Sequence, residues 1–189
     1  MITNILLLLN SLFYLVPSLL DGTLDPVPGI GTPVYTKLMA WGNFNNIDLN
    51  NGEYYRLISS MFLHWGLVHF VFNMVSLYQM GPYVEEKFGS GKMGIIYLVS
   101  GLAGGLATYY FGGSGKASAG ASGAIFGLVG ALISYFLLNQ SSVSSAILPQ
   151  LFLIVAINMY FGFASQNIGN AAHIGGLIGG LIVGFIFAR

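Results

Sequence analysis

A serine and a histidine stand at the starts of two apolar stretches of the chain, where they could carry out acyl transfer. Ser122 lies in the sequence GASGA at Gly120–Ala124, where a loop of small residues becomes an apolar run, and His173 opens the last apolar run. A serine hydroxyl becomes a nucleophile when a nearby base accepts its proton, and histidine is the commonest base. Free N–H groups at a helix N-terminus can also stabilise a developing oxyanion. The pattern therefore predicts acyl transfer at Ser122.

The composition indicates that lipid is the main solvent of this chain. Of 189 residues, 55% are hydrophobic and 6% are charged, which cannot cover one soluble domain with a water-compatible surface. Six Lys/Arg balance six Asp/Glu, so no basic footprint for nucleic acid exists and nucleic acid is excluded as a partner. The chain has no cysteine, which excludes disulfides, thiolate metal sites and cysteine nucleophiles.

Six apolar runs are long enough to cross a bilayer, whose hydrocarbon core of about 30 Å takes about 20 helical residues. They cover Thr3–Leu20, Trp65–Gly81, Met93–Phe111, Ser122–Leu138, Ala146–Phe163 and Ala171–Ala188. The segment Asp21–His64 is rich in Tyr, Trp, Leu and Met, so we expect it to lie on or partly in the membrane. The sequence therefore predicts an all-α membrane protein, with six transmembrane helices in a compact bundle and a long membrane-embedded first loop. Residues 1–189 are expected to form a single domain.

The three histidines lie in or beside these runs, where an ionisable group costs at least about 2.5 kcal/mol and is a functional candidate. Asn73 follows His69 by four residues, so the two share a helix face. His64 is expected to precede the regular helix, with Gly66 permitting the break. Alternating crossings put the starts of the second, fourth and sixth helices on one side of the membrane. This parity brings the histidines, Ser122 and Asn73 to similar depth.

Stripes of small residues on the fourth and sixth predicted helices offer a way to bring the serine and the histidine together. Gly176, Gly180 and Gly184 form one stripe below His173, and Gly123, Gly127 and Gly130 form a flat surface below Ser122. Such stripes let two helix backbones approach closely in a membrane. If they pack together, His173 meets Ser122 at one end of the contact. Glycine stripes also serve ordinary membrane packing, so they do not establish a site by themselves.

The order of three motifs resembles the rhomboid family of intramembrane serine proteases, in its minimal six-helix bacterial form. The motifs are HxxxxHxxxN at His64–Asn73, GASG at Gly120–Gly123 and AHxxG at Ala172–Gly176, on predicted helices two, four and six. The resemblance covers nearly the whole chain. It implies a catalytic dyad without an acid, in which Ser122 is the nucleophile and His173 is the general base. The residues agree, since no carboxylate lies in any of the six runs.

The resemblance also assigns roles to residues around the dyad. It implies that Phe126, where a tyrosine is frequent in the family, stacks on the catalytic histidine. The side chains of His69 and Asn73 would surround the oxyanion together with the Ser122 backbone N–H, and Gly120 would line the same oxyanion and substrate-binding region. Two supporting residues complete the expected site. His64 would support it from behind, and Arg56 would anchor the first loop, where Tyr55 replaces the family's frequent tryptophan.

The family resemblance further implies the surroundings of the reaction. Transmembrane protein substrates would enter laterally between helices two and five, with membrane lipids as the other partner, and a hydrated cavity would open outward beneath the loop Ala164–Asn170. Lys/Arg counts on the two sides tie, but the family orientation favours an N-terminus inside and an active site near the outer face. The predicted location is a bacterial inner (plasma) membrane, with several passes.

Three other interpretations were weighed against this one. A metal site of three histidines is disfavoured, because His64 and His69 do not share a helix face and no carboxylate lies nearby; neither a metal nor a cofactor is predicted. A transporter would require a buried acid or paired broken helices, and the sequence predicts instead that Glu85, Glu86 and Lys87 form a solvated inner turn. A catalytically inactive rhomboid-like protein that binds membrane proteins remains the alternative.

Overall fold

Helices are the only regular elements in the part of the chain that the structure describes. A computed structural model describes residues 1–113, 117–140, 142–164 and 169–189. Its α-helices are α1 (Ile2–Leu20), α2 (Pro33–Gly42), α3 (Asn46–Asn50), α4 (Arg56–Ser59), α5 (Gly66–Phe88), α6 (Ser90–Phe111), α7 (Ser122–Leu138), α8 (Ser142–Ala164) and α9 (Asn170–Phe187), and a 3-10 turn covers Ser60–Phe62. The all-α prediction is confirmed for these residues, with two isolated β-bridges as the only extended pairings among them.

A helix occupies each of the six predicted apolar ranges, namely α1, α5, α6, α7, α8 and α9. By length and apolarity, α1, α6 and α9 could each cross a membrane, within the residues described. A fourth crossing results if Arg56–Phe62 and α5 form one span with a 91° bend. Six crossings and a membrane-embedded first loop therefore stay predictions.

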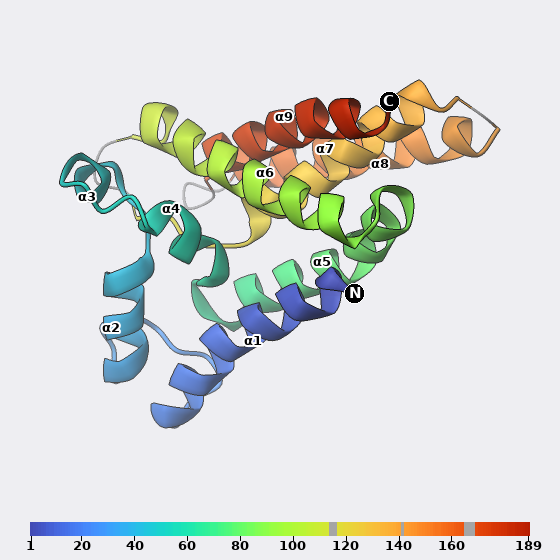
Figure 1. The fold of residues 1–189 in the computed structure, drawn as a ribbon. Coiled ribbons are helices and arrows are strands. Elements are labelled where there is room, and N and C mark those ends of the chain that lie inside the picture. The colour runs from blue at the N-terminus through green and yellow to red at the C-terminus, as the bar shows by residue number, and fades with distance from the viewer. Residues whose placement is uncertain (114–116, 141, 165–168) are drawn as a thin grey trace.

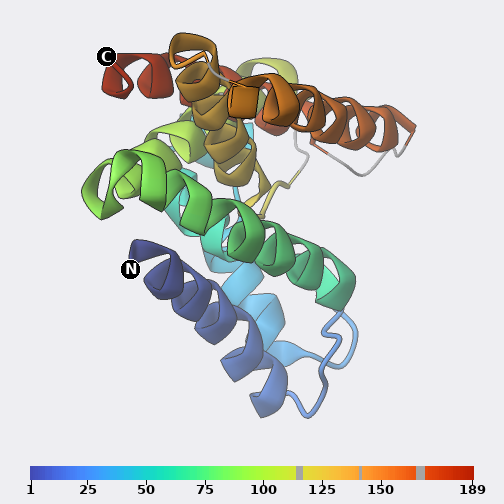
Figure 2. The same cartoon turned by 90° about the vertical axis from the view of Figure 1, so that its right-hand side faces the viewer.

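The helix α7 forms the centre of the bundle. Every residue of this helix from Gly123 to Ser134 is buried. The helices α6 and α9 pack closely against α7 and against each other, while α5 and α8 pack on its remaining sides. Figures 1 and 2 show α1 lying beside α5, below the group formed by α6, α7 and α9. Ser122, the first residue of α7, therefore starts a helix that is surrounded by others.

The predicted glycine stripes face each other between α7 and α9. A methyl group added to Gly176 would collide with the carbonyl group of Gly123, and one added to Gly180 would collide with that of Gly127. One turn further on, a methyl group on Gly184 would meet the backbone of Ala131. The two backbones are thus in direct contact over three turns, which fixes the register of α9 against α7.

The turn between α5 and α6 differs from the sequence prediction of a solvated turn. The helix α5 continues through Pro82 to Phe88, and Glu85 within it is buried, with 7% of its surface exposed. Its carboxylate accepts hydrogen bonds from the backbone N–H groups of Ile2 (2.7 Å) and Thr3 (3.2 Å) and from the Thr3 hydroxyl (2.6 Å). The Ser90 hydroxyl donates another. Glu85 therefore satisfies the free N–H groups at the start of α1 and holds α1 against α5.

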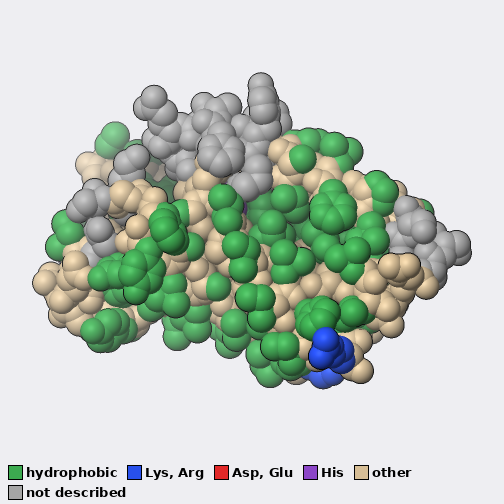
Figure 3. Space-filling model, turned by 90° about the horizontal axis from the view of Figure 1, so that it is seen from above, with side chains coloured by type: hydrophobic (Ala, Val, Ile, Leu, Met, Phe, Trp, Pro, Cys, Tyr) green, Lys and Arg blue, Asp and Glu red, His purple; other side chains and the backbone are tan. Residues whose placement is uncertain are grey.

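Lys92 and Arg189 lie at the end of the molecule that carries both termini. Lys92 donates to the carbonyl oxygen of Phe187 (3.2 Å), and the guanidinium of Arg189 lies 4.3 Å from the centre of the Phe185 ring. Seen from above in Figure 3, hydrophobic side chains spread over the visible face, while Lys and Arg appear in one patch. On this face, the Lys and Arg side chains are therefore separate from the hydrophobic surface.

The first loop is folded against the helices and carries its own small core. Asp21 accepts hydrogen bonds from the backbone N–H groups of Val34 (3.0 Å) and Tyr35 (2.8 Å), which places a carboxylate at the start of α2. Asp25 does the same for α5 through the N–H of Leu67 (2.8 Å). A buried cluster beneath them consists of Tyr14, Tyr35, Met39, Leu63 and Phe70. The segment is thus an ordered part of the fold.

Replacing Gly180 by alanine should destabilise the protein by about 1–3 kcal/mol, because the added methyl group meets a backbone that cannot move aside. Gly91 is the matched control: it lies in α6 with nothing within 4 Å of an added methyl group. Gly91→Ala should leave stability unchanged or raise it by about 0.5–1 kcal/mol. Thermal unfolding in detergent measures both, and equal midpoints for the two variants would contradict the close contact of α7 and α9.

Candidate active site

Ser122 and His173 meet at one end of the contact between α7 and α9. The Ser122 Oγ lies 2.9 Å from the His173 Nε2, a hydrogen-bonding distance across 51 residues of sequence. Both residues lie in the first turn of their helices, Ser122 at the start of α7 and His173 near the start of α9. The glycine contact between Gly123, which directly follows Ser122, and Gly176, one turn after His173, holds the two helix starts at this separation.

The His173 ring is held by stacking. The ring of Phe126, one turn below Ser122, lies parallel to it at 8°, with 4.4 Å between the ring centres. The His173 Nδ1 is buried and has no hydrogen-bond partner among the described residues, so no carboxylate orients the imidazole there. Among the described residues, an aromatic face and the register of the helices orient the imidazole.

His69 lies on the other side of Ser122, against Gly120. An added methyl group on Gly120 would stand 3.0 Å from the His69 Nε2 and 3.7 Å from the Ser122 Oγ, so both groups border the same small space. The backbone N–H of Trp65 points at the His69 Nδ1 at 3.3 Å, which assigns Nδ1 as an acceptor. In neutral imidazole the other nitrogen then carries the hydrogen. The Nε2–H is therefore available as a donor beside the serine.

The remaining predicted polar residues, Asn73 and His64, both contact His69. The Asn73 Nδ2 donates to the backbone carbonyl of His69 (2.8 Å), so one of its two hydrogens is in use within α5. His64 is fully buried before the start of α5, and its ring centre lies 5.3 Å from that of His69. The prediction that His64 precedes the helix is confirmed, and Gly66 has the left-handed φ of +80° at the bend.

Two contacts from the first loop hold the extended segment that precedes Ser122, and no pattern in the sequence indicates them. Phe44 and Ser118 form an antiparallel bridge, with their N–H groups donating to each other's carbonyl oxygens at 2.8 and 2.7 Å. The Gly120 N–H donates to the carbonyl oxygen of Ser60 at 2.9 Å. Isolated bridges of this kind leave no periodic pattern in a sequence, which is why they were missed.

Arg56 organises the part of the loop that carries Phe44. The residue is 7% exposed, and its guanidinium donates to the carbonyl oxygens of Ala40 (2.8 Å) and Asn43 (2.9 Å). It also contacts the carboxylates of Glu53 (2.6 Å) and Asp48 (3.5 Å). The hydrogen bond and charge of Arg56 lower the pKa of Glu53 below its ordinary value. Arg56 thus ties the end of α2 to α3 and α4, as a planar guanidinium can.

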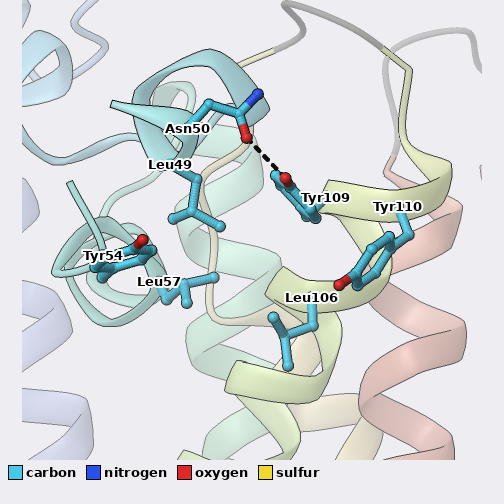
Figure 4. Close-up of a pocket in the computed structure, with 7 residues that line it drawn as sticks. All are labelled: Leu49, Asn50, Tyr54, Leu57, Leu106, Tyr109 and Tyr110. Carbon is cyan, nitrogen blue, oxygen red and sulfur yellow. Dashed lines mark hydrogen bonds between the residues drawn. The ribbon is translucent and has the colours of Figure 1, made fainter. Parts of the chain in front are cut away.

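Two pockets lie in the described part of the chain, and neither Ser122 nor His173 lines them. A pocket of about 360 Å³ between α3, α4 and the end of α6 is lined by Leu57, Leu106 and tyrosines, and Figure 4 shows the Tyr109 hydroxyl donating to Asn50 there. Among the described residues, no group of three or more metal-binding side chains comes together. The cavity predicted beneath the loop Ala164–Asn170 cannot be placed, because residues 165–168 lie outside the described part of the chain.

The family model of the rhomboid domain matches residues 51–189, which is more than half of the chain. The chain belongs to the rhomboid family. It is 44% identical to Rhomboid protease GluP of Bacillus subtilis (strain 168) over 143 residues, 76% of this chain. It is also 38% identical to RHOMBOID-like protein 5 of Arabidopsis thaliana over 161 residues, 84% of this chain.

This rhomboid chain spans only part of those relatives. The matched region covers 28% of Rhomboid protease GluP and 51% of RHOMBOID-like protein 5. RHOMBOID-like protein 6, mitochondrial, of Arabidopsis thaliana is 41% identical over 73% of this chain and 45% of that protein. Family membership and the apolar helices together make this a multi-pass membrane protein.

Arg56→Ala should lower the midpoint of thermal unfolding by about 5 °C or more at pH 7, because two carboxylates and two carbonyl oxygens lose a buried partner. The lowered pKa of Glu53 predicts how this loss of stability depends on pH. Stabilisation of a carboxylate with a lowered pKa is complete above its ordinary value of 4.5 and is lost as the pH falls through the lowered value.

The gap between wild type and Arg56→Ala should therefore narrow as the pH is taken from 7 to below 4.5. Arg56→Lys is the matched comparison, since it keeps the charge but not the planar set of donors, and it should recover only part of the loss. A gap that stays constant across the pH range would show that the ion pair with Glu53 does not contribute.

Proposed function

We propose that this rhomboid chain is an intramembrane serine endopeptidase that cleaves transmembrane segments of other membrane proteins. The observation that carries the proposal is the 2.9 Å distance between the Ser122 Oγ and the His173 Nε2. In a family that includes Rhomboid protease GluP, such a pair at two adjacent helix starts supports peptide-bond hydrolysis over a structural role.

The chemistry follows from the two groups. The Ser122 hydroxyl donates its proton to the His173 Nε2 as its oxygen attacks the scissile carbonyl carbon, and a tetrahedral oxyanion forms. The intermediate collapses as the carbon–nitrogen bond breaks, and the Nε2 gives its proton to the leaving amine. Water then attacks the acyl-enzyme, with His173 again accepting a proton. Stacking on Phe126 keeps the imidazole in place throughout, so an acid is not required for its orientation.

Three donors are proposed to stabilise the oxyanion. The Ser122 backbone N–H lies at a helix N-terminus, where N–H groups lack partners within the helix. The His69 Nε2–H borders the same space, and the Trp65 N–H supports the tautomer that donates. The second N–H of Asn73 would join them after a small rotation. Gly120, with φ +145°, leaves room for the substrate backbone beside His69.

In the same proposal, residues 1–189 form one domain with six membrane crossings and a first loop embedded in the membrane. The end of the molecule that carries both termini, Lys92 and Arg189 faces the cytoplasm of a bacterial cell. The dyad lies near the outer face of the inner membrane. A substrate helix enters laterally between α5 and α8, then unwinds over Ser122. Exposed apolar side chains on α5, such as Val68 and Phe72, suit contact with lipid or with such a helix.

The alternative is a rhomboid-like protein that binds membrane proteins without cleaving them. The two readings differ in whether product forms, so a cleavage assay separates them directly. Binding of a single-span substrate without any product would favour the inactive protein.

Cleavage of a model single-span substrate by detergent-purified protein is expected for the wild type and for neither Ser122→Ala nor His173→Ala. Each substitution should lower the rate by about 10⁴-fold or more, because nucleophile and base act as a unit. Product is measured by gel and mass spectrometry.

Thermal unfolding serves as the control that both variants fold. Equal product from all three proteins would reject the dyad. A zinc chelator should leave the wild-type rate unchanged, and loss of activity on chelation would support the metal-site interpretation instead.

His69→Ala should lower kcat by about 10²–10³-fold with little change in KM, because an oxyanion donor acts mainly in the transition state. His69→Gln offers a side-chain N–H at similar reach and should recover part of the loss. A His69→Gln rate no higher than that of His69→Ala, at equal thermal stability, would assign His69 a packing role.

A further inference from the structure

An apolar groove of about 430 Å³ lies between α1 and the helices of the first loop, away from Ser122 and His173. Its lining includes Leu9, Phe13, Trp41, Tyr55, Ile58 and Phe62. In Figure 1, α2 and α4 lie on the side of the bundle away from the N-terminus. The lining residues extend from these helices to Leu9 and Phe13 of α1. It is thus a site that the proposed proteolysis does not use.

The groove has two different ends. Trp41 and Tyr55 form one end, with 5.3 Å between their ring centres, at the level of the short helices. Phe13 and Phe62 form the other, at 6.2 Å, beside the middle of α1. Since α1 is long and apolar enough to cross the membrane, the second end lies at the depth of lipid chains, and the first lies at the depth where Trp and Tyr favour the membrane surface.

The groove is almost wholly apolar, and its lining residues with a polar side-chain group are Trp41, Tyr55 and Ser59, whose hydroxyl donates to the carbonyl oxygen of Gly42 (2.9 Å). The Tyr55 hydroxyl already donates to the carbonyl oxygen of Trp41 and contacts Glu53, at 3.1 Å each. The Trp41 indole can only donate, and Trp41 is half exposed. Lys37 precedes Trp41 by four residues on α2, so the ammonium group lies on the same helix face one turn away.

The acids of the first loop are all engaged elsewhere. Asp21 and Asp25 cap α2 and α5, while Asp48 and Glu53 contact Arg56. Lys37 is exposed and makes no ion pair with any described residue, which leaves it as the cation next to the groove without a counter-charge. An occupant with an apolar chain and an acceptor-rich anionic group at one end would match both parts.

We propose that this groove binds one acyl chain of a glycerophospholipid, whose phosphate is held by Lys37 and the Trp41 indole. The volume lies in the range of about 300–1,000 Å³ typical of small-ligand pockets. It is too small for a transmembrane helix, which is about 10–12 Å wide and about 30 Å long. The lipid packs α4 against α1 and so stabilises the first loop. This site does not depend on the proposed protease activity.

The test for the chain uses two adjacent leucines of α1. Leu9 lines the groove, whereas Leu8 is 58% exposed and does not line it. Purified full-length protein is mixed with phosphatidylethanolamine in detergent, and retained lipid is counted by native mass spectrometry. Wild type and Leu8→Trp should each retain one tightly bound phospholipid, while Leu9→Trp, which fills the groove, should lose it. Ile58→Trp is a second filling variant, should Leu9→Trp fold poorly.

Equal retention by Leu8→Trp and a folded groove-filling variant overturns the proposal, and so does retention of detergent in place of phospholipid by the wild type. Thermal unfolding provides a second readout, because a lipid that binds the folded state raises the midpoint. Added phosphatidylethanolamine should raise it for wild type and Leu8→Trp and leave that of Leu9→Trp nearly unchanged. A rise of equal size in all three proteins also counts against a bound lipid in this groove.

The test for the phosphate uses Lys37→Gln with Lys92→Gln as the matched control at the opposite end of the molecule. Lys37→Gln should weaken phosphatidylethanolamine binding by about two- to fivefold, as expected for loss of an exposed ion pair, and Lys92→Gln should not. Diacylglycerol with the same chains lacks the phosphate and should bind wild type and Lys37→Gln equally. Phospholipid binding that is identical in both lysine variants would overturn the assignment of the phosphate to Lys37.

Discussion

Direct backbone contact between α7 and α9 is the constraint on which the rest of this structure depends. Gly123 faces Gly176 and Gly127 faces Gly180 so closely that no side chain fits between them. In lipid, burial of apolar surface does not drive helices together, so close packing of small residues has to do it. The contact also sets a register, and at its end that register leaves the Ser122 hydroxyl and the His173 imidazole 2.9 Å apart.

The same constraint explains how the His173 imidazole is held in place without a carboxylate. A buried acid in a membrane helix costs free energy, whereas a phenyl ring costs none there. Phe126 lies parallel to the His173 ring and restricts its rotation, while the glycine contact fixes the helix that carries it. The acids are placed instead at the ends of helices. Glu85 satisfies the start of α1, and Asp21 that of α2, where free N–H groups attract a negative charge.

The first loop connects the two sides of the candidate site. Arg56 binds carbonyl oxygens and carboxylates of the loop. Phe44, in the same loop, forms a single bridge with Ser118 in the segment before Ser122. The N–H of Trp65, at the bend that Gly66 permits, accounts for the tautomer of His69. Rigid positioning of a small number of groups is what a site of this kind requires. The loop therefore has a structural part in the site although it contains neither Ser122 nor His173.

The sequence by itself determined the six long helices and the faces of α7 and α9 that pack together. Apolar length located all six long helices, since a helix exposed to lipid needs an unbroken apolar run. Glycine spacing predicted the contact of α7 with α9, because residues four apart share a face. It also predicted that His64 would precede α5. These features are local or periodic, so they leave a pattern that can be read along the chain.

Only the tertiary structure decided which isolated groups meet. The sequence prediction of a solvated turn was wrong for Glu85, because its partners, Ile2 and Thr3, lie more than eighty residues away and reach it only after α1 packs on α5. The bridge between Phe44 and Ser118 and the groove beside Leu9 have the same origin. Both depend on contacts between segments far apart in the sequence, and such contacts impose no repeating pattern on the residues that make them.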